Sequence, residues 1–210
     1  MSGDKTITSY NLGSRHVAIV RQFAKDNGYP SASSALRRII DEWVLLKARE
    51  RDLEVWPVIC VVPSGHEKPR GILEQHPEWA LRDKNGKPAG YVSPCNPKAR
   101  EWMAAMVAEV VGRYRPEGVL LDYLRFASQA PRLDPEGTAA FEKQFPLAAS
   151  ATEAERKTAL QAFKEASLTE LARMTREAVR KERPQTRIGL YTWGPQVTAG
   201  HSIAQRWDIW

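Results

Sequence analysis

Hydrophobic and polar positions alternate along the chain between two periods, one helical and one typical of short buried strands. Apolar residues at three- and four-residue spacing predict helices from about Ser14 to Asn27, from Ser31 onward and from Pro97 onward. Short continuous apolar runs, rich in β-branched residues, predict strands. These strands are predicted at residues 55–62, 119–122 and 187–193. Alternating helices and strands indicate an α/β fold for this part of the chain.

Two capping boxes predict further helices in the second half of the chain. Thr152-x-x-Glu155 and Ser167-x-x-Glu170 each have the pattern in which side chains and backbone at a helix start satisfy one another. Each box is therefore expected to open a helix. Residues 127–150, rich in Ala, Pro and Phe, are expected to form a loop.

The first quarter of the chain has a different sequence of predicted elements from the rest. Residues 5–12 alternate as a strand does, Asn27-Gly28 suits a helix C-cap, and Ser31 suits the N-cap of the next helix. Strand, helix, turn and helix in about 45 residues resemble the ribbon-helix-helix DNA-binding fold of the Arc/MetJ class. We therefore expect a ribbon-helix-helix-like module over residues 1–48.

This resemblance implies a homodimer whose paired strands enter the major groove of DNA. The outward strand positions fall on Ile7, Ser9 and Asn11, of which Ser9 and Asn11 can hydrogen-bond base edges, and Lys5 can reach phosphate. DNA binding through residues 5–46 is thus one expectation. A dimerisation ribbon without base reading, or a barrel helix over residues 34–52, are the alternatives.

Asp122 closes the apolar run 119–122, and Tyr123 and Arg125 follow it. In a parallel barrel the carboxyl ends of the strands carry the active site. A carboxylate there can act as nucleophile, base or stabiliser in sugar chemistry. The alternative is an Asp that caps the next loop or pairs with Arg125.

A series of ordered motifs surrounds this run. They are HPEW, an NGKP turn, PCNP, VVGRYRPEG, LLDYLRF, RIGLYTWG and AQRWDIW. Together they resemble the bacterial glycosyl-hydrolase-like barrel family, usually described as family-10-like glycosylhydrolases. The resemblance implies a TIM-type (β/α) barrel over residues 53–210. A complete barrel needs eight strands and roughly 250 residues, so the expected barrel is partial, and a truncated or inactive protein is among the expectations.

The resemblance implies a glycoside hydrolase acting on a bacterial glycan, with Asp122 as the principal carboxylate. Glycoside hydrolysis usually needs a second carboxylate. Glu67, Glu78 and Asp208 are candidates, and Asp208 lies nearest a matched motif. The expected substrate-binding residues are Asn96, Tyr123, Arg125, Tyr191, Trp193 and Trp207. A dimeric DNA-binding regulator with a sugar-sensing or vestigial barrel half, and an inactive scaffold, are the other readings.

Composition adds little to this picture. The net charge of +6 is mild for 210 residues and does not by itself indicate nucleic acid. Cys60 and Cys95 have no metal-site spacing, and we expect them to be reduced thiols of a cytoplasmic protein, with a single disulfide as the alternative. No metal or cofactor is expected. Neither a secretory signal nor a membrane-spanning stretch is apparent.

Overall fold

A computed structural model describes residues 14–128 and 130–210 of the chain. These residues divide into two compact units, with the boundary between Leu53 and Glu54. The predicted strand 5–12, with Lys5, Ser9 and Asn11, lies outside the described residues.

The first unit contains the two predicted helices, α1 (Ser14–Asp26) and α2 (Ala32–Arg49). Gly28, with a φ of +69°, lies between them. The side chain of Ser31 accepts a hydrogen bond from the Ser34 amide at 3.1 Å, as expected for the N-cap. The two helices share a small core, whose fully buried members are Val20, Ala24 and Ala35.

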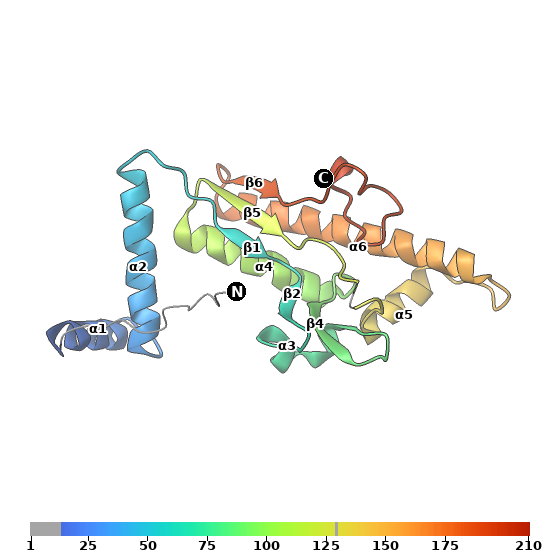
Figure 1. Ribbon diagram of the computed structural model, residues 1–210, viewed down its shortest axis with the longest axis horizontal. Coiled ribbons are helices and arrows are strands. Elements are labelled where there is room, and N and C mark those ends of the chain that lie inside the picture. The colour runs from blue at the N-terminus through green and yellow to red at the C-terminus, as the bar shows by residue number, and fades with distance from the viewer. Residues whose placement is uncertain (1–13, 129) are drawn as a thin grey trace, which may run out of the picture. The chain divides into compact units, whose positions relative to one another are not determined.

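The second unit is built on three parallel strands in the order β1, β5, β6. Helix α4 leads from β1 towards β5, helix α6 leads from β5 towards β6, and the two helices pack against each other along the sheet (Figure 1). The bounds are β1 Val58–Cys60, α4 Pro97–Tyr114, β5 Gly118–Asp122, α6 Glu153–Glu182 and β6 Arg187–Leu190. Sequential parallel strands joined by helices form a βαβαβ arrangement.

The two faces of this sheet differ. Val119 and Leu121 point into the main core, where they join apolar side chains of α4 and α6. Because side chains alternate along a strand, Leu120 and Asp122 belong to the opposite face. Val58 and Cys60, which lie in register with them on β1, are both exposed. Cys60 and Asp122 therefore lie side by side on this second face, at the carboxyl ends of β1 and β5.

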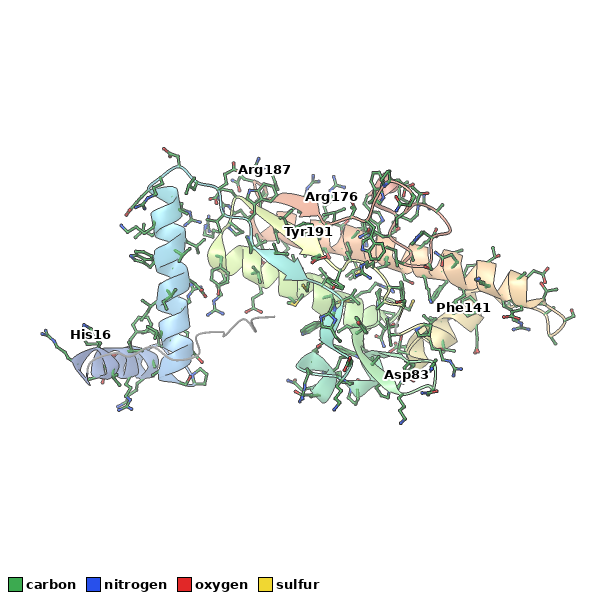
Figure 2. The ribbon with its side chains drawn as sticks, in the orientation of Figure 1. His16, Asp83, Phe141, Arg176, Arg187 and Tyr191 are labelled. Carbon is green, nitrogen blue, oxygen red and sulfur yellow. The ribbon has the colours of Figure 1, made fainter. Side chains whose placement is uncertain are left out.

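A second sheet, antiparallel and in the order β2, β4, β3, lies between β1 and α4 in the sequence. Its strands are β2 Pro63–His66, β3 Ala80–Arg82 and β4 Pro88–Val92, with α3 Ile72–Gln75 and the 3₁₀ helix η1 Pro77–Trp79 before β3. The predicted Asn85-Gly86 turn joins β3 to β4, with the Asp83 carboxylate accepting from the Asn85 and Lys87 amides. Asp83 is labelled at this turn in Figure 2.

Several predicted elements have other bounds in the structure. The predicted strand 55–62 is reduced to Val58–Cys60, since Pro57 cannot donate to a ladder and the chain turns into β2 at Pro63. The strand 187–193 ends at Leu190. The expected loop 127–150 contains α5, Pro135–Gln144, whose N-cap Asp134 accepts from the Gly137 amide at 3.0 Å. Asp134-Pro135 is a normal helix start, so the sequence carried this signal.

The prediction that both capping boxes open a helix was right for only one of them. Thr152 and Glu155 do form a reciprocal box at the start of α6. Ser167, however, lies within the same 30-residue helix, buried rather than capping. A Ser-x-x-Glu pattern inside a continuous helical periodicity does not start a new helix, because the preceding residues already satisfy its amide groups.

The observed fold is mixed α/β with two small sheets, as predicted at that level. A complete barrel is not shown: the described residues supply three parallel strands in one sheet. No helix within the described residues is long and apolar enough to cross a membrane.

Candidate functional site

Asp122 ends the middle strand of the parallel sheet, where β1 and β6 flank it. Its Oδ1 accepts a hydrogen bond from the Tyr123 amide at 2.6 Å, and its carbonyl accepts from Val61 at 2.9 Å. The carboxylate is partly exposed. Burial raises the pKa of the neighbouring Cys60 thiol, and the charge of Asp122 raises it further. Asp122 is therefore a fixed, solvent-accessible negative charge at the carboxyl edge of the sheet.

Arg125 does not form an ion pair with Asp122, which was one of the two alternatives predicted from the sequence. Its guanidinium lies 4.4 Å from the centre of the Tyr123 ring and 5.1 Å from that of Trp193. One nitrogen donates a long hydrogen bond, 3.4 Å, to the Phe126 carbonyl. The Arg125 guanidinium thus makes cation–π contacts with two aromatic rings, and among the described residues it forms no salt bridge with a carboxylate.

Tyr123 adopts a left-handed backbone conformation, with a φ of +53°. For a non-glycine residue such a conformation costs about 1–3 kcal/mol and is found disproportionately at functional sites. The Tyr123 ring lies near both the Arg125 guanidinium and the His66 ring. The centres of the Tyr123 and His66 rings are 5.7 Å apart, nearly perpendicular.

His66 and Tyr91 were not predicted to belong to the site. Nδ1 of His66 lies 3.4 Å from the Tyr91 hydroxyl, and the two rings meet edge to face. Strands β2 and β4 approach closely here: a Cβ on Gly90 would lie 2.5 Å from the His66 nitrogen, so only glycine fits. The sequence carries no local signal for this contact, which depends on strand pairing.

The pKa of Tyr91 depends on several of these neighbouring residues. Burial raises the pKa of the Tyr91 hydroxyl, the charges of Tyr123 and Glu67 also raise it, and Arg125 opposes them. Glu67, an exposed residue that directly follows His66, therefore contributes to the electrostatics of the same group. We call His66, Tyr91, Tyr123, Arg125 and Trp193 the aromatic–arginine cluster.

Gln205 fixes the segments that carry this cluster. It is fully buried, its Oε1 accepts from the Trp193 amide at 3.3 Å, and its Nε2 donates to the carbonyls of Tyr191 (3.2 Å) and Leu124 (3.4 Å). One side chain thus joins the ends of β5 and β6. Tyr191, labelled in Figure 2, and Trp193 both follow β6, and each has 52% of its surface exposed.

The other predicted site residues have structural partners. Asn96 is buried; its amide oxygen accepts from Lys98 and Ala99 at the start of α4, and its nitrogen donates to Asp134 and Glu136. Asn96 therefore has no polar atom left for a ligand, and its substrate-binding role has no support in the structure.

Asp208 and Trp207 lie in η2 (Trp207–Ile209). Arg206 donates to both carboxylate oxygens of Asp208, at 3.0–3.3 Å, and holds the pKa of Asp208 below its usual range. The indole nitrogen of Trp207 is buried without a hydrogen-bond partner among the described residues. Among the described residues, neither Asp208 nor Trp207 forms a hydrogen bond or ion pair with Asp122.

Over residues 14–128 and 130–210, no group of three or more His, Cys, Asp or Glu side chains is placed to hold a metal ion. Two shallow hollows hold about 550 and 580 Å³. One is lined by residues of α5, among them Phe141 (labelled in Figure 2), and the other lies between α4 and α6. Asp122 lines neither of them.

Comparison with known proteins adds one weak similarity. No family model matches the sequence, and no curated protein matches it. An α-galactosidase from Thermus thermophilus, solved in complex with stachyose, aligns with 66% of this chain and 26% of its own, at 17% identity and a TM-score of 0.40. The aligned part is thus about a quarter of that enzyme. At this level neither the fold nor the activity of the enzyme transfers to this chain, and neither the barrel-family nor the ribbon-helix-helix resemblance is matched by a family model.

Proposed function

We propose that residues 54–210 act as a glycoside-hydrolase-like domain, which binds a glycan at the carboxyl ends of β1, β5 and β6. The observation that carries this proposal is the position of Asp122. It ends the middle parallel strand beside an arginine and several aromatic rings, and no described cation neutralises it in a salt bridge. A carboxylate in that position can act on a glycosidic bond as nucleophile or base.

Exposed aromatic rings at the same edge support sugar binding. Trp193 and Tyr191 follow β6 with about half of their surfaces exposed, although each is tied to Gln205 through its backbone. The apolar faces of sugar rings pack on such aromatic surfaces. Because their backbone is fixed, these rings offer a preformed platform beside Asp122.

We assign the second carboxylate to Glu67 in preference to Asp208. The second carboxylate must be able to act on the same glycosidic bond as Asp122. Both carboxylate oxygens of Asp208 accept from Arg206, so Asp208 is occupied by an ion pair. Glu67 directly follows His66, and its charge acts on Tyr91, within the aromatic–arginine cluster.

The test is hydrolysis by the purified full chain of a panel of neutral and acidic oligosaccharides, followed through the reducing ends released. We expect Asp122→Asn to lower turnover at least about 100-fold and Glu67→Gln to lower it as well. Glu109→Gln, on the exposed side of α4, is the control and should have no effect. Unchanged turnover in Asp122→Asn, with an unchanged circular dichroism spectrum, would overturn the catalytic assignment.

A dimeric, DNA-binding first unit is a second candidate function. Apolar side chains on α2 are exposed, among them Trp43 (59%) and Leu46 (54%), and the two helices bury few residues between them. Exposed apolar surface of this kind indicates a partner surface. The partner in this proposal is a second copy of the chain, and the dimer would bind DNA through residues 5–46.

A further inference from the structure

We infer that the glycan carries an anionic group and that Arg125 binds it. This inference rests on the proposed function and narrows the substrate class, from glycans in general to those with a carboxylate or sulfate group on a sugar ring. Both groups present two oxygens in a plane, which suits the fork of a guanidinium.

The first observation concerns the hydrogen-bond and ion-pair partners of Arg125. Several other arginines in this unit are bonded to carboxylates: Arg173 to Glu170 and Glu177, Arg187 to Glu54, and Arg206 to Asp208. Among the described residues Arg125 has no such partner. Its guanidinium donates a single hydrogen bond within the described residues, to the Phe126 carbonyl, and that bond is 3.4 Å long. A guanidinium has five N–H donors, so most of those of Arg125 remain for water or a ligand.

The second step is orientation. Tyr123 and Trp193 contact the guanidinium by cation–π interaction, and Gln205 fixes the backbone of Trp193. A guanidinium held on aromatic rings keeps its N–H groups directed along its edge, in the plane of the group. It is therefore pre-organised, and a bidentate anion would bind it with little loss of side-chain freedom.

The third step is the location of the neighbouring acids. Asp122 lies at the end of β5, but its Oδ1 accepts from the Tyr123 amide and it forms no salt bridge with Arg125. Glu67 acts electrostatically on Tyr91 and likewise forms no salt bridge with Arg125. The other titratable groups around Arg125 are His66, Tyr91 and Tyr123. The positive charge of Arg125 is thus not neutralised by direct contact, while Asp122 stays free for the reacting bond.

The experiment is isothermal titration calorimetry with the full chain, which needs no knowledge of the natural glycan. The probes are hexuronate trimers of galacturonate, glucuronate and mannuronate, each compared with its fully methyl-esterified form. A sulfated galactotriose and the neutral galacto-, cello- and maltotrioses complete the panel. Esterification removes the charge and leaves the sugar ring in place, so each pair isolates the anionic group.

We expect at least one acidic trimer to bind tenfold or more tightly than its ester, with affinity falling as salt rises. Arg125→Gln should remove this difference, and Arg125→Lys should restore only part of it, because lysine keeps the charge without the fork. Arg113→Gln is the matched control, since Arg113 also lies over a tyrosine ring, Tyr114, but in the last turn of α4. It should bind as the unmodified chain does.

The possible outcomes distinguish a failure of the anionic inference from a failure of the proposed glycan-binding function. Equal binding of a trimer and its ester, unaffected by Arg125→Gln, would overturn the anionic inference and leave glycan binding standing. Tighter binding of the sulfated probe than of any uronate would support the inference and identify sulfate as the anion. No binding of any acidic or neutral probe would overturn the proposed function, and the inference with it.

Discussion

Cys60 and Asp122 lie opposite each other in register on the parallel strands β1 and β5. The thiol is exposed, yet its pKa is raised, first by desolvation and then by the neighbouring carboxylate. Because the thiolate is the reacting form, Cys60 should react slowly with alkylating reagents at neutral pH. The thiol therefore reports on the charge of Asp122.

We predict that Asp122→Asn speeds the alkylation of Cys60 by iodoacetamide at pH 8 about two- to fivefold, because removing the carboxylate charge lowers the pKa of the thiol and so raises its thiolate fraction. Cys95 should stay silent in the folded protein, since it is buried and its pKa is raised to about 12. Mass spectrometry of the modified peptides measures both rates. Asp208→Asn should leave the Cys60 rate unchanged, and an equal effect of both variants would place Asp122 away from the thiol.

A second prediction concerns Gln205, whose amide joins the ends of β5 and β6. Gln205→Ala removes the partner of the buried Leu124 carbonyl and of the partly buried Trp193 amide and Tyr191 carbonyl. We therefore expect a loss of about 1–3 kcal/mol in the free energy of unfolding. Urea unfolding followed by tryptophan fluorescence measures it. Gln196→Ala, an exposed position in the loop after β6, should change stability by less than about 0.5 kcal/mol.

The start of helix α6 yields a third prediction. Thr152 caps the helix and Glu155 completes the reciprocal box, so Thr152→Ala should cost about 1 kcal/mol of stability. Thr158→Ala, the same substitution at an exposed position inside α6, should be neutral or slightly stabilising, because alanine is the better helix former.

The same box predicts a pH dependence. Hydrogen bonds from the Thr152 backbone and side chain hold the pKa of Glu155 below its usual range. A carboxyl group whose pKa is lower in the folded state stabilises the fold above its unfolded pKa, and this contribution is lost as pH falls through the folded pKa. The stability difference between the unmodified chain and Thr152→Ala should therefore shrink below about pH 4. A difference that stays constant down to pH 2 would contradict the capping box.

These elements also show where local sequence patterns suffice. Asn96-Pro97 starts α4 and the apolar run before Asp122 forms β5, because capping and burial act over a few neighbouring residues. Ser167 shows the limit: its local pattern is that of a cap, but the helix passes through it. Whether a capping pattern is used depends on whether the preceding residues are already helical.

The aromatic–arginine cluster could be predicted only in part. Asp122 and Arg125 are three residues apart, a spacing that invites an ion pair, but the left-handed turn at Tyr123 redirects the chain between them. The contact of His66 with Tyr91 depends on the pairing of β2 with β4 at Gly90, and the contact of Arg125 with Trp193 on the pairing of β5 with β6. Pairings between distant segments have no signature in local sequence.

A further prediction tests the first unit. We expect the full chain to sediment as a dimer at micromolar concentration, with α2 at the interface. Trp43→Glu should shift it towards monomer, because a charge would be buried in an apolar contact. Trp193→Glu, a substitution at a similarly exposed tryptophan in the second unit, should leave the dimer intact. A monomeric unmodified chain would remove the dimer from the proposal.

The last prediction concerns DNA, for which the relevant strand positions, Lys5, Ser9 and Asn11, lie outside the described residues. If the first unit binds DNA mainly through phosphates, affinity for a pool of random duplexes should fall steeply as salt rises, because phosphate contacts release counterions. Lys5→Gln should then weaken binding to all sequences and reduce the salt slope by about 1.

Asn11→Ala should behave differently from Lys5→Gln. It should cost about 1–3 kcal/mol on a preferred site selected from the pool and little on random duplex, since its amide would contact base edges. Fluorescence anisotropy at several salt concentrations measures both effects. Unaltered binding in both variants would show that residues 5–12 are not the DNA-contacting segment. No binding at low salt would leave the first unit a dimerisation module, and the function would then rest on the glycan site at Asp122.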